Sequence, residues 1–254
     1  MIQNKVGFVH IPRTGGTYLE ALFCSMGPEK FINFFGTPES QIVNKLGVVE
    51  RIESDTARQK CLLEIPNWNT ATLFSGHFSL NIKKFLPKDY SYDFITIIRD
   101  PVNRTYSFIK KVTSSRGFKR VLTDNGQIAV GALDFWKNFQ EYYQKNDHTG
   151  LSNHEINGFS NYITKVFAGC DLSNIIHVNE AIYQEARSNL SQAKYIGLFE
   201  NYKQTVDDLL SMFDIQNIRY HIRENTSVSN IDTETENFIR SINNYDIKLY
   251  EEFK

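Results

Sequence analysis

Apolar residues along the chain fall into short runs that alternate with segments of helical spacing. Short β-prone runs occur at residues 6–11, 71–74, 93–98, 175–178 and 195–198, and the run at 93–98, DFITII, is continuous and rich in β-branched residues. Apolar spacing and capping residues predict helices that begin near residue 17 and at 41–53, 102–109, 127–143, 161–167, 179–189 and 206–213, with two short helices at 232–253. This repeated order of strand and helix predicts an α/β fold with a central parallel sheet flanked by helices.

The first strand leads directly into a loop with two adjacent glycines. The sequence from Val6 to Phe23, VGFVHIPRTGGTYLEALF, reads as strand, tight loop and helix. Gly15 and Gly16 allow close backbone approach and positive φ, and Thr17 stands where a helix would begin, so several N–H groups converge at the positive end of a helix dipole. Such a point binds phosphate or sulfate, and Arg13 adds a permanent charge suited to oxyanions. The motif lacks the Gly-Lys-Ser/Thr of a Walker A loop, and a structural turn without a ligand is the alternative.

A second strand, turn and helix carries a cluster of basic residues. The run at 93–98 ends at Arg99, and Pro101 stands at the first position of the next helix. From Arg99 to Arg120 there are seven basic residues and one acidic residue, Asp100; the basic residues are Arg99, Arg104, Lys110, Lys111, Arg116, Lys119 and Arg120. A solvated helix face and a surface for an anionic ligand or acceptor both explain such a run. Arg99 directly follows a buried strand and is therefore the member least like an ordinary surface charge.

His77 follows the short run at 71–74 and stands just beyond a predicted strand. Ligands of open α/β sheets bind outside the carboxyl ends of the strands, so His77 lies where chemistry is expected. A histidine in this place can also cap or pack, and that structural alternative stays open. For His10, at the end of the first strand, we expect a structural role.

Composition narrows the range of partners and compartments. The chain has 254 residues, 41% of them hydrophobic, and we expect one domain over residues 1–254 with helical insertions at about 26–71 and 115–160. The net charge of −1 argues against general binding to nucleic acid or to an anionic membrane. The sequence shows no signal peptide and no apolar stretch of transmembrane length, which predicts a soluble, cytoplasmic protein or a domain cut from a longer one. Cys24, Cys61 and Cys170 lack metal-ligand spacing, so we expect buried reduced thiols and no metal site.

Two segments together resemble a known family. His10–Thr17, HIPRTGGT, and Ile98–Ser107, IRDPVNRTYS, are similar to the two cofactor motifs of sulfotransferases that use 3′-phosphoadenosine 5′-phosphosulfate (PAPS). Later segments resemble further family motifs in the same order, at Ser75–Ser79, Asn161–Gly169, Tyr195–Glu200 and Asp246–Tyr250. The likeness is strongest to the branch that contains heparan sulfate and uronyl 2-O-sulfotransferases and their bacterial relatives.

The resemblance implies a P-loop-like sulfotransferase fold and roles for individual residues. The 5′-phosphosulfate would be held by Arg13, Thr14, Gly15, Gly16, Thr17 and Tyr18. Arg99 and Ser107 would hold the 3′-phosphate, and Arg223, in a late polar loop, is the candidate to close over the cofactor. His77 would act as general base, and Arg13 would neutralise charge on the leaving phosphate. The reaction would be in-line transfer of a sulfuryl group to an acceptor hydroxyl on a carbohydrate, which leaves 3′-phosphoadenosine 5′-phosphate (PAP) and needs no metal.

Two residues depart from the commoner family pattern. Arg13 stands where most members have lysine, and arginine stabilises charge but does not readily donate a proton, because its pKa exceeds about 12. Ser75 stands where the heparan enzymes carry another histidine, so their acceptor is not carried over to this chain. We expect the acceptor to be a glycan or a hydroxyl-bearing small molecule, and no residue pattern favours one acceptor or one oligomeric state.

Two other classes of protein stay open at this point. A P-loop kinase or nucleotide hydrolase would need a lysine after the glycines and a carboxylate for Mg²⁺, and neither is evident in the sequence. A non-catalytic nucleotide- or glycan-binding module is the second alternative. The occurrence of His77 together with both phosphate loops disfavours such a module.

Overall fold

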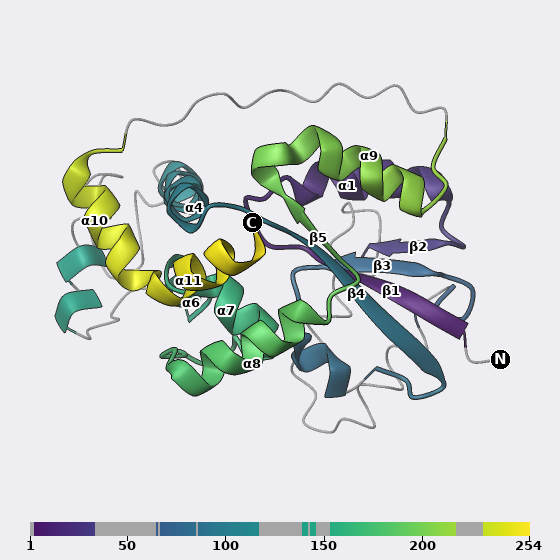
Figure 1. Cartoon of the computed structure of the whole chain (residues 1–254), viewed down its shortest axis with the longest axis horizontal. Helices are drawn as coiled ribbons and strands as arrows, with labels where there is room; N and C mark the ends of the chain where they lie inside the picture. Colours follow the sequence, from purple (N-terminus) through teal and green to yellow (C-terminus); the bar gives the residue numbers. More distant parts are fainter. Residues whose placement is uncertain are drawn as a thin grey trace, which may run out of the picture.

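Five parallel strands form one central sheet in the order β2-β3-β1-β4-β5, which confirms the predicted α/β fold (Figure 1). The strands are β1 (Gln3–Val9), β2 (Phe31–Asn33), β3 (Leu73–Gly76), β4 (Tyr90–Ile98) and β5 (Tyr195–Leu198). This computed structural model describes residues 3–33, 65, 67–84, 86–116, 139–141, 143–145, 153–216 and 231–254. Within these parts of the chain, no helix is both long and apolar enough to cross a bilayer.

Helices cover both faces of the sheet, which explains why the second halves of β1 and β4 are buried without interruption. The α-helices are α1 (Gly16–Phe23), α4 (Pro101–Arg116), α6 (Asn153–Phe159), α7 (Tyr162–Phe167), α8 (Glu180–Ser191), α9 (Tyr202–Met212), α10 (Thr233–Ile242) and α11 (Asn244–Phe253). Short 3-10 turns occur at Cys24–Met26, Leu80–Lys84 and Phe199–Asn201. Figure 1 shows α1 and α9 together over one face, with α7 and α8 on the other side.

Alternate residues of each central strand enter different cores. Phe8 of β1 and Ile95 of β4 pack with α1 and α9, whereas Val9 and Ile98 belong to the core that contains residues of α7 and α8. A third apolar cluster joins α4, α6 and α10 beyond the end of the sheet. The sheet is therefore a buried layer, and its functional surface must lie at a strand end.

The order of the strands identifies that end. β1 lies at the centre of the sheet, between β3 and β4. The chain first builds β2 and β3 on one side of β1 and then crosses to build β4 and β5 on the other, which makes the β1–β4 boundary the switch point of this sheet. Ligands of open α/β folds bind at the carboxyl ends of the strands at such a point.

Two distant helices cap each other through buried side chains. The Asp246 carboxylate, on α11, accepts hydrogen bonds from the N–H groups of Ile163 (3.0 Å) and Thr164 (2.7 Å) in the first turn of α7. In return, the Asn161 side chain at the start of α7 accepts bonds from the N–H groups of Tyr245 (3.0 Å) and Asp246 (3.1 Å). The backbone donors at the starts of both helices are satisfied in this way, and the C-terminal segment is fixed to the helical layer.

Most of the predicted strands and helices are present within the described residues, and one strand was wrong. Residues 175–178 form no strand, because the Asn157 side chain binds the backbone of this stretch instead of a neighbouring strand. Its amide nitrogen donates to the carbonyl of Asn174 (2.7 Å), and its oxygen accepts from the N–H of Ile176 (3.2 Å). The following helix does begin as predicted, with the Asn179 side chain accepting from the N–H of Ile182.

Smaller corrections concern the insertions, the first helix and the cysteines. The expected insertions at about 26–71 and 115–160 contain most of the residues outside the described ranges, including all of the helix expected at 41–53, and the first also contributes the edge strand β2. Helix α1 begins at Gly16, one residue before Thr17, with Gly15 in the N-cap position. Cys24 is exposed and Cys170 half-buried, so the expectation of buried thiols was wrong for Cys24, which begins the turn that follows α1.

Candidate functional site

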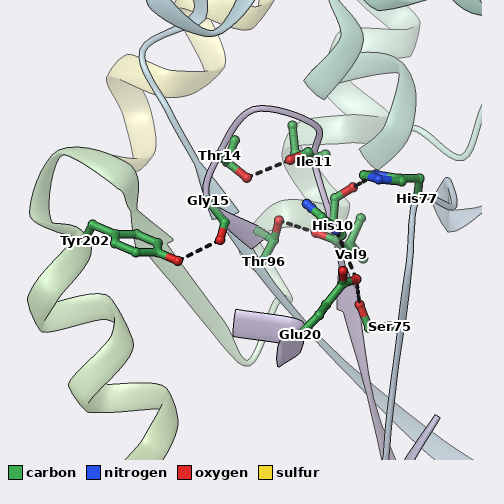
Figure 2. Close-up of polar contacts among 10 residues, drawn as sticks. All are labelled: Val9, His10, Ile11, Thr14, Gly15, Glu20, Ser75, His77, Thr96 and Tyr202. Atoms are coloured by element: carbon green, nitrogen blue, oxygen red, sulfur yellow. Dashed lines mark hydrogen bonds and ion pairs between the residues drawn. The ribbon is translucent and has the colours of Figure 1, made fainter. Parts of the chain in front are cut away.

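The loop between β1 and α1 forms an arch over the carboxyl end of the central strand (Figure 2). Gly15 has a φ of 84°, and no side chain caps the N-terminus of α1. The Thr14 hydroxyl donates to the carbonyl of Ile11 (2.7 Å) and closes the arch from within, and the Thr14 side chain is fully buried. The loop therefore presents backbone N–H groups at the positive end of a helix, which is the arrangement that binds anions.

Both glycines are needed because rings pack against them. A Cβ atom on Gly15 would lie 2.6 Å from the Tyr202 ring, whose hydroxyl donates to the Gly15 carbonyl (2.7 Å). A Cβ atom on Gly16 would lie 2.2 Å from the ring of His10. Tyr202 and His10 thus hold the loop from two sides (Figure 2).

Arg13, Arg99 and Ser107 meet at this arch, although they are far apart in the sequence. The Arg13 Nε–H donates to the Ser107 hydroxyl (2.9 Å), on α4. Arg99, directly after β4, donates from Nη1 to the Arg13 carbonyl (3.1 Å). The two predicted phosphate loops therefore lie side by side at the β1–β4 switch point.

Two guanidinium groups lie together at this point, with the carboxylates of Glu200 and Asp100 acting on Arg99 from nearby. The Arg99 Nε–H is buried and has no hydrogen-bond partner among the described residues, and the Arg99 guanidinium lies over the Phe199 ring at 4.3 Å. Burial lowers the pKa of Arg99; the Glu200 carboxylate opposes this effect, and the positive charge of Arg13 adds to it. An anion bound here would relieve the repulsion between Arg13 and Arg99.

His77 lies just beyond β3, as predicted, on the side of the arch away from Tyr202 (Figure 2). Its Nδ1 lies 2.8 Å from the carbonyl oxygen of His10, so Nδ1 is the nitrogen that carries a hydrogen. The basic lone pair of the neutral ring is then on Nε2. This fixed tautomer is the form that a general base requires.

A buried carboxylate lies beneath the arch. Glu20, on α1, accepts hydrogen bonds from His10 Nδ1 (3.0 Å) and from the Ser75 hydroxyl. Burial raises the pKa of the Glu20 carboxyl, but the hydrogen bond and charge of His10 and the hydroxyl of Ser75 outweigh burial, and the pKa lies below its usual value. Glu20 is therefore ionised at neutral pH.

Comparison with known proteins decides the family. The model of a group described as "Sulfotransferase family" matches residues 3–254, which is nearly the whole chain. The chain belongs to the sulfotransferase family. Among solved structures, a sulfotransferase from Alicyclobacillus acidocaldarius matches with a TM-score of 0.48 and 11% identity over 97% of this chain and 94% of that one. The comparison with curated proteins finds no match.

In this sulfotransferase, one of the seven basic residues has a role that neither sequence interpretation anticipated. Arg104 is completely buried: Nη1 donates to the Gly158 carbonyl (2.5 Å), and Nε lies 3.4 Å from the Pro12 carbonyl oxygen. Its guanidinium lies over the Tyr162 ring at 4.6 Å. Arg104 therefore connects the start of the arch to α6 and α7, and it lies neither on a solvated face nor on a surface for an acceptor.

The other basic residues of that run divide into two groups. Lys110 and Lys111 are exposed on α4, which fits both a solvated face and a surface for an anionic ligand or acceptor. The Arg116 side chain, Lys119 and Arg120 lie outside the described residues, as does Arg223, the candidate for closing over the cofactor.

The sequence analysis missed two residues that contribute to this candidate site. Glu20 lies one helical turn after Gly16, and this spacing places both on the same face of α1, so a polar residue on that face was a usable indication. Tyr202 gave no such indication, because an aromatic residue at the start of an amphipathic helix is usually part of the core. Within the described residues, no group of three or more His, Cys, Asp and Glu side chains is placed to hold a metal.

Proposed function

We propose that this sulfotransferase takes its sulfuryl group from PAPS and that the arch and the Arg99 turn bind the two ends of that donor. The observation that carries the proposal is the convergence of Arg13, Arg99 and Ser107 at the switch point, next to a glycine loop that has no room for a Cβ. The fit is chemical as well as spatial, since the buried Nε–H of Arg99 lacks a partner among the described residues. Two separate phosphate-binding turns match a donor that is phosphorylated at both the 3′ and the 5′ positions.

We assign the individual residues the roles that the family resemblance implies, and the arrangement is compatible with them. The N–H groups from Arg13 to Thr17, with Tyr18, bind the 5′ end, and Arg99 and Ser107 bind the 3′-phosphate. The Thr14 side chain is occupied by the Ile11 carbonyl, so Thr14 acts through its backbone. Arg13 stabilises the negative charge that develops on the leaving phosphate and supplies no proton.

His77 is proposed as the general base. Bound PAPS supplies a sulfuryl group that is already activated for transfer. As the acceptor oxygen bonds to sulfur and the bond from sulfur to the phosphate oxygen breaks, His77 Nε2 takes the acceptor proton. The hydrogen bond from Nδ1 to the His10 carbonyl orients the ring and stabilises the imidazolium that forms.

For the acceptor, we propose a hydroxyl of a carbohydrate, and the motifs favour the branch of 2-O-sulfotransferases. Lys110 and Lys111 are exposed on the helix that carries Ser107, which gives that side of the site a positive surface suited to an acidic glycan. The Ser75 hydroxyl is buried against Glu20, so the position where the heparan enzymes have a second histidine contributes no group to an acceptor here.

A titration calorimetry experiment tests the donor. We expect PAP to bind tightly without metal and ATP with Mg²⁺ to bind at least tenfold more weakly, since only PAP carries a 3′-phosphate. Arg99→Met should weaken PAP by about 10- to 100-fold, from the loss of a charged hydrogen bond of about 1.5–3 kcal/mol. Arg187→Met, an exposed arginine on α8, is the matched control and should leave PAP binding unchanged.

Preference for ATP with Mg²⁺ would refute the choice of donor.

A separate experiment tests the acceptor. The enzyme is incubated with PAPS and separate pools of acidic glycans, neutral glycans and small alcohols, and mass spectrometry detects the gain of one SO₃ group. Arg223→Ala tests the proposed closure over the cofactor. This variant should bind PAP more weakly in the calorimetry, and mass spectrometry should find the same site of sulfation.

A further inference from the structure

The mechanism leaves one buried titratable pair unused, His10 and Glu20, directly beneath the arch. His10 is 3% exposed, and its ring lies 4.1 Å from the ring of His77 between centroids and is stacked on Phe8. Nδ1 is bound to Glu20, and the opposite edge of the ring, with Nε2, lies against Gly16, 2.5 Å from the position of a Cβ there. Figure 2 shows the His10 ring within the arch, between Gly15 and His77. One nitrogen thus contacts a carboxylate while the other points to the start of α1.

This arrangement poses an electrostatic problem for anion binding. If His10 is neutral, the pair carries the full negative charge of Glu20, in a buried place beneath a loop that must bind an anion. Like charges at short distance in a poorly solvated place repel each other strongly. If His10 is protonated, the pair is neutral, and Nε2 becomes a hydrogen-bond donor at the base of the loop.

We propose that His10 is a donor-binding residue whose imidazolium form, balanced by Glu20, donates its Nε2–H into the arch, so that PAPS or PAP binds together with a proton. This inference rests on the proposed function of the arch as the site for the 5′ end of PAPS. It assigns to Glu20 the role of a positioning residue that holds the ring through Nδ1 and keeps the protonated form neutral as a pair. Histidine suits this task because it changes its charge readily near neutral pH.

The surroundings of His10 limit what else can take up the proton. Among the described residues, the other titratable groups that interact with Glu20 are His77, beyond β3, and Cys24, after α1. Burial, with a smaller contribution from the charge of Glu20, raises the pKa of Cys24. Phe8, Gly16 and Ser75, which also contact the pair, do not titrate in this range. Burial disfavours the ionised form of Cys24, which therefore enters and leaves the binding reaction as a neutral thiol.

The test is the number of protons bound with PAP. Calorimetry at pH 7.5 in two buffers with different enthalpies of ionisation gives this number directly, and the PAP phosphates, with a second pKa of about 6, are mostly dianionic there. The wild-type enzyme should take up a proton, and its affinity for PAP should fall by up to about tenfold per pH unit as the pH rises. His10→Gln keeps a donor near the position of Nε2 but cannot gain charge, so the uptake should disappear.

Two further variants separate this role from a structural one. His77→Ala should keep the uptake, which identifies His10 as its source. Glu20→Gln leaves the His10 ring in place but removes the balancing charge, so the uptake should also disappear, and this variant provides the test if His10→Gln does not fold. The inference is wrong if proton uptake persists in Glu20→Gln and in a folded His10→Gln. It is also wrong if the uptake is lost in His77→Ala alone. Either result leaves the proposed function intact. Failure of the wild-type enzyme to bind PAP would instead refute the proposed function and this inference with it.

Discussion

The contact between Gly16 and His10 predicts that Gly16→Ala destabilises the fold. The general preference of helices for alanine predicts the opposite. Gly16 lies in α1 with a φ outside the left-handed region, so alanine is compatible with its backbone. Without other contacts, Gly16→Ala should stabilise the fold by about 0.4–1 kcal/mol. The new Cβ would, however, lie 2.2 Å from His10 Cδ2.

The His10 ring has little freedom to move away. An ordinary carbon–carbon contact is about 3.5 Å, so the ring or the start of α1 must shift by about 1.3 Å. The ring is held by Glu20 at 3.0 Å and lies 4.1 Å from the His77 ring, so the helix start has to move instead. Overpacking of this kind costs about 1–3 kcal/mol, which leaves a net destabilisation of up to about 2 kcal/mol.

A double-mutant cycle on thermal unfolding tests this reasoning. Gly16→Ala should lower Tm by up to roughly 4–8 °C in the wild-type background, from a loss of up to about 2 kcal/mol at about 2–4 °C per kcal/mol for a chain of this size. In a His10→Ala background, where the ring is absent, the same substitution should raise Tm by a few degrees. If Gly16→Ala lowers Tm equally in both backgrounds, the ring is not the obstacle, and the argument about the arch is wrong.

Three further outcomes are expected. His77→Ala should lower the transfer rate by about 10²–10⁴-fold with unchanged affinity for PAP, and near-normal transfer would remove His77 from the mechanism. Ser107→Ala should weaken PAP binding by about tenfold, since it removes a neutral donor to a charged phosphate and the partner of Arg13. It should not change the binding of adenosine 5′-monophosphate, which lacks the 3′-phosphate. An equal loss of affinity for both ligands would contradict the assignment. Burial lowers the pKa of Lys165 from 10.5 to about 8, so between these values the unfolded chain binds more protons than the folded one and the contribution of this residue to stability increases with pH. The Tm of wild type minus the Tm of Lys165→Met should therefore increase from pH 8 to 9.5. A flat or opposite trend would contradict this prediction.

The sequence predicted the sheet well because its strands are buried on both faces. A run such as that at 93–98 has no polar face, so its apolar residues are contiguous, and β4 lies where this pattern places it. The stretch at 175–178 shows the limit of this reasoning, since its residues are equally β-prone but Asn157 satisfies their backbone. No local pattern reveals that a side chain from another helix takes the place of a neighbouring strand.

The candidate site was predictable where its residues follow strands and not where they pack beneath a loop. His77 and Arg99 lie at the carboxyl ends of β3 and β4, a position that the order of elements defines in advance. Arg104 belongs to the same basic run as Lys110, yet it is fully buried between α4, α6 and α7. Its burial depends on contacts with residues more than 50 positions away, which charge counting along one helix cannot detect.

The mutual capping of α7 and α11 has a consequence for synthesis on the ribosome. The amides of Ile163 and Thr164 have their hydrogen-bond acceptor in Asp246, which lies 82 or more positions later in the chain. The central strands and α1 can assemble while the chain still emerges, but this helical layer closes only after residue 246 has been made and has left the ribosome. A nascent chain that is stalled or cut short before residue 246 would therefore expose an unfinished layer to chaperones and proteases.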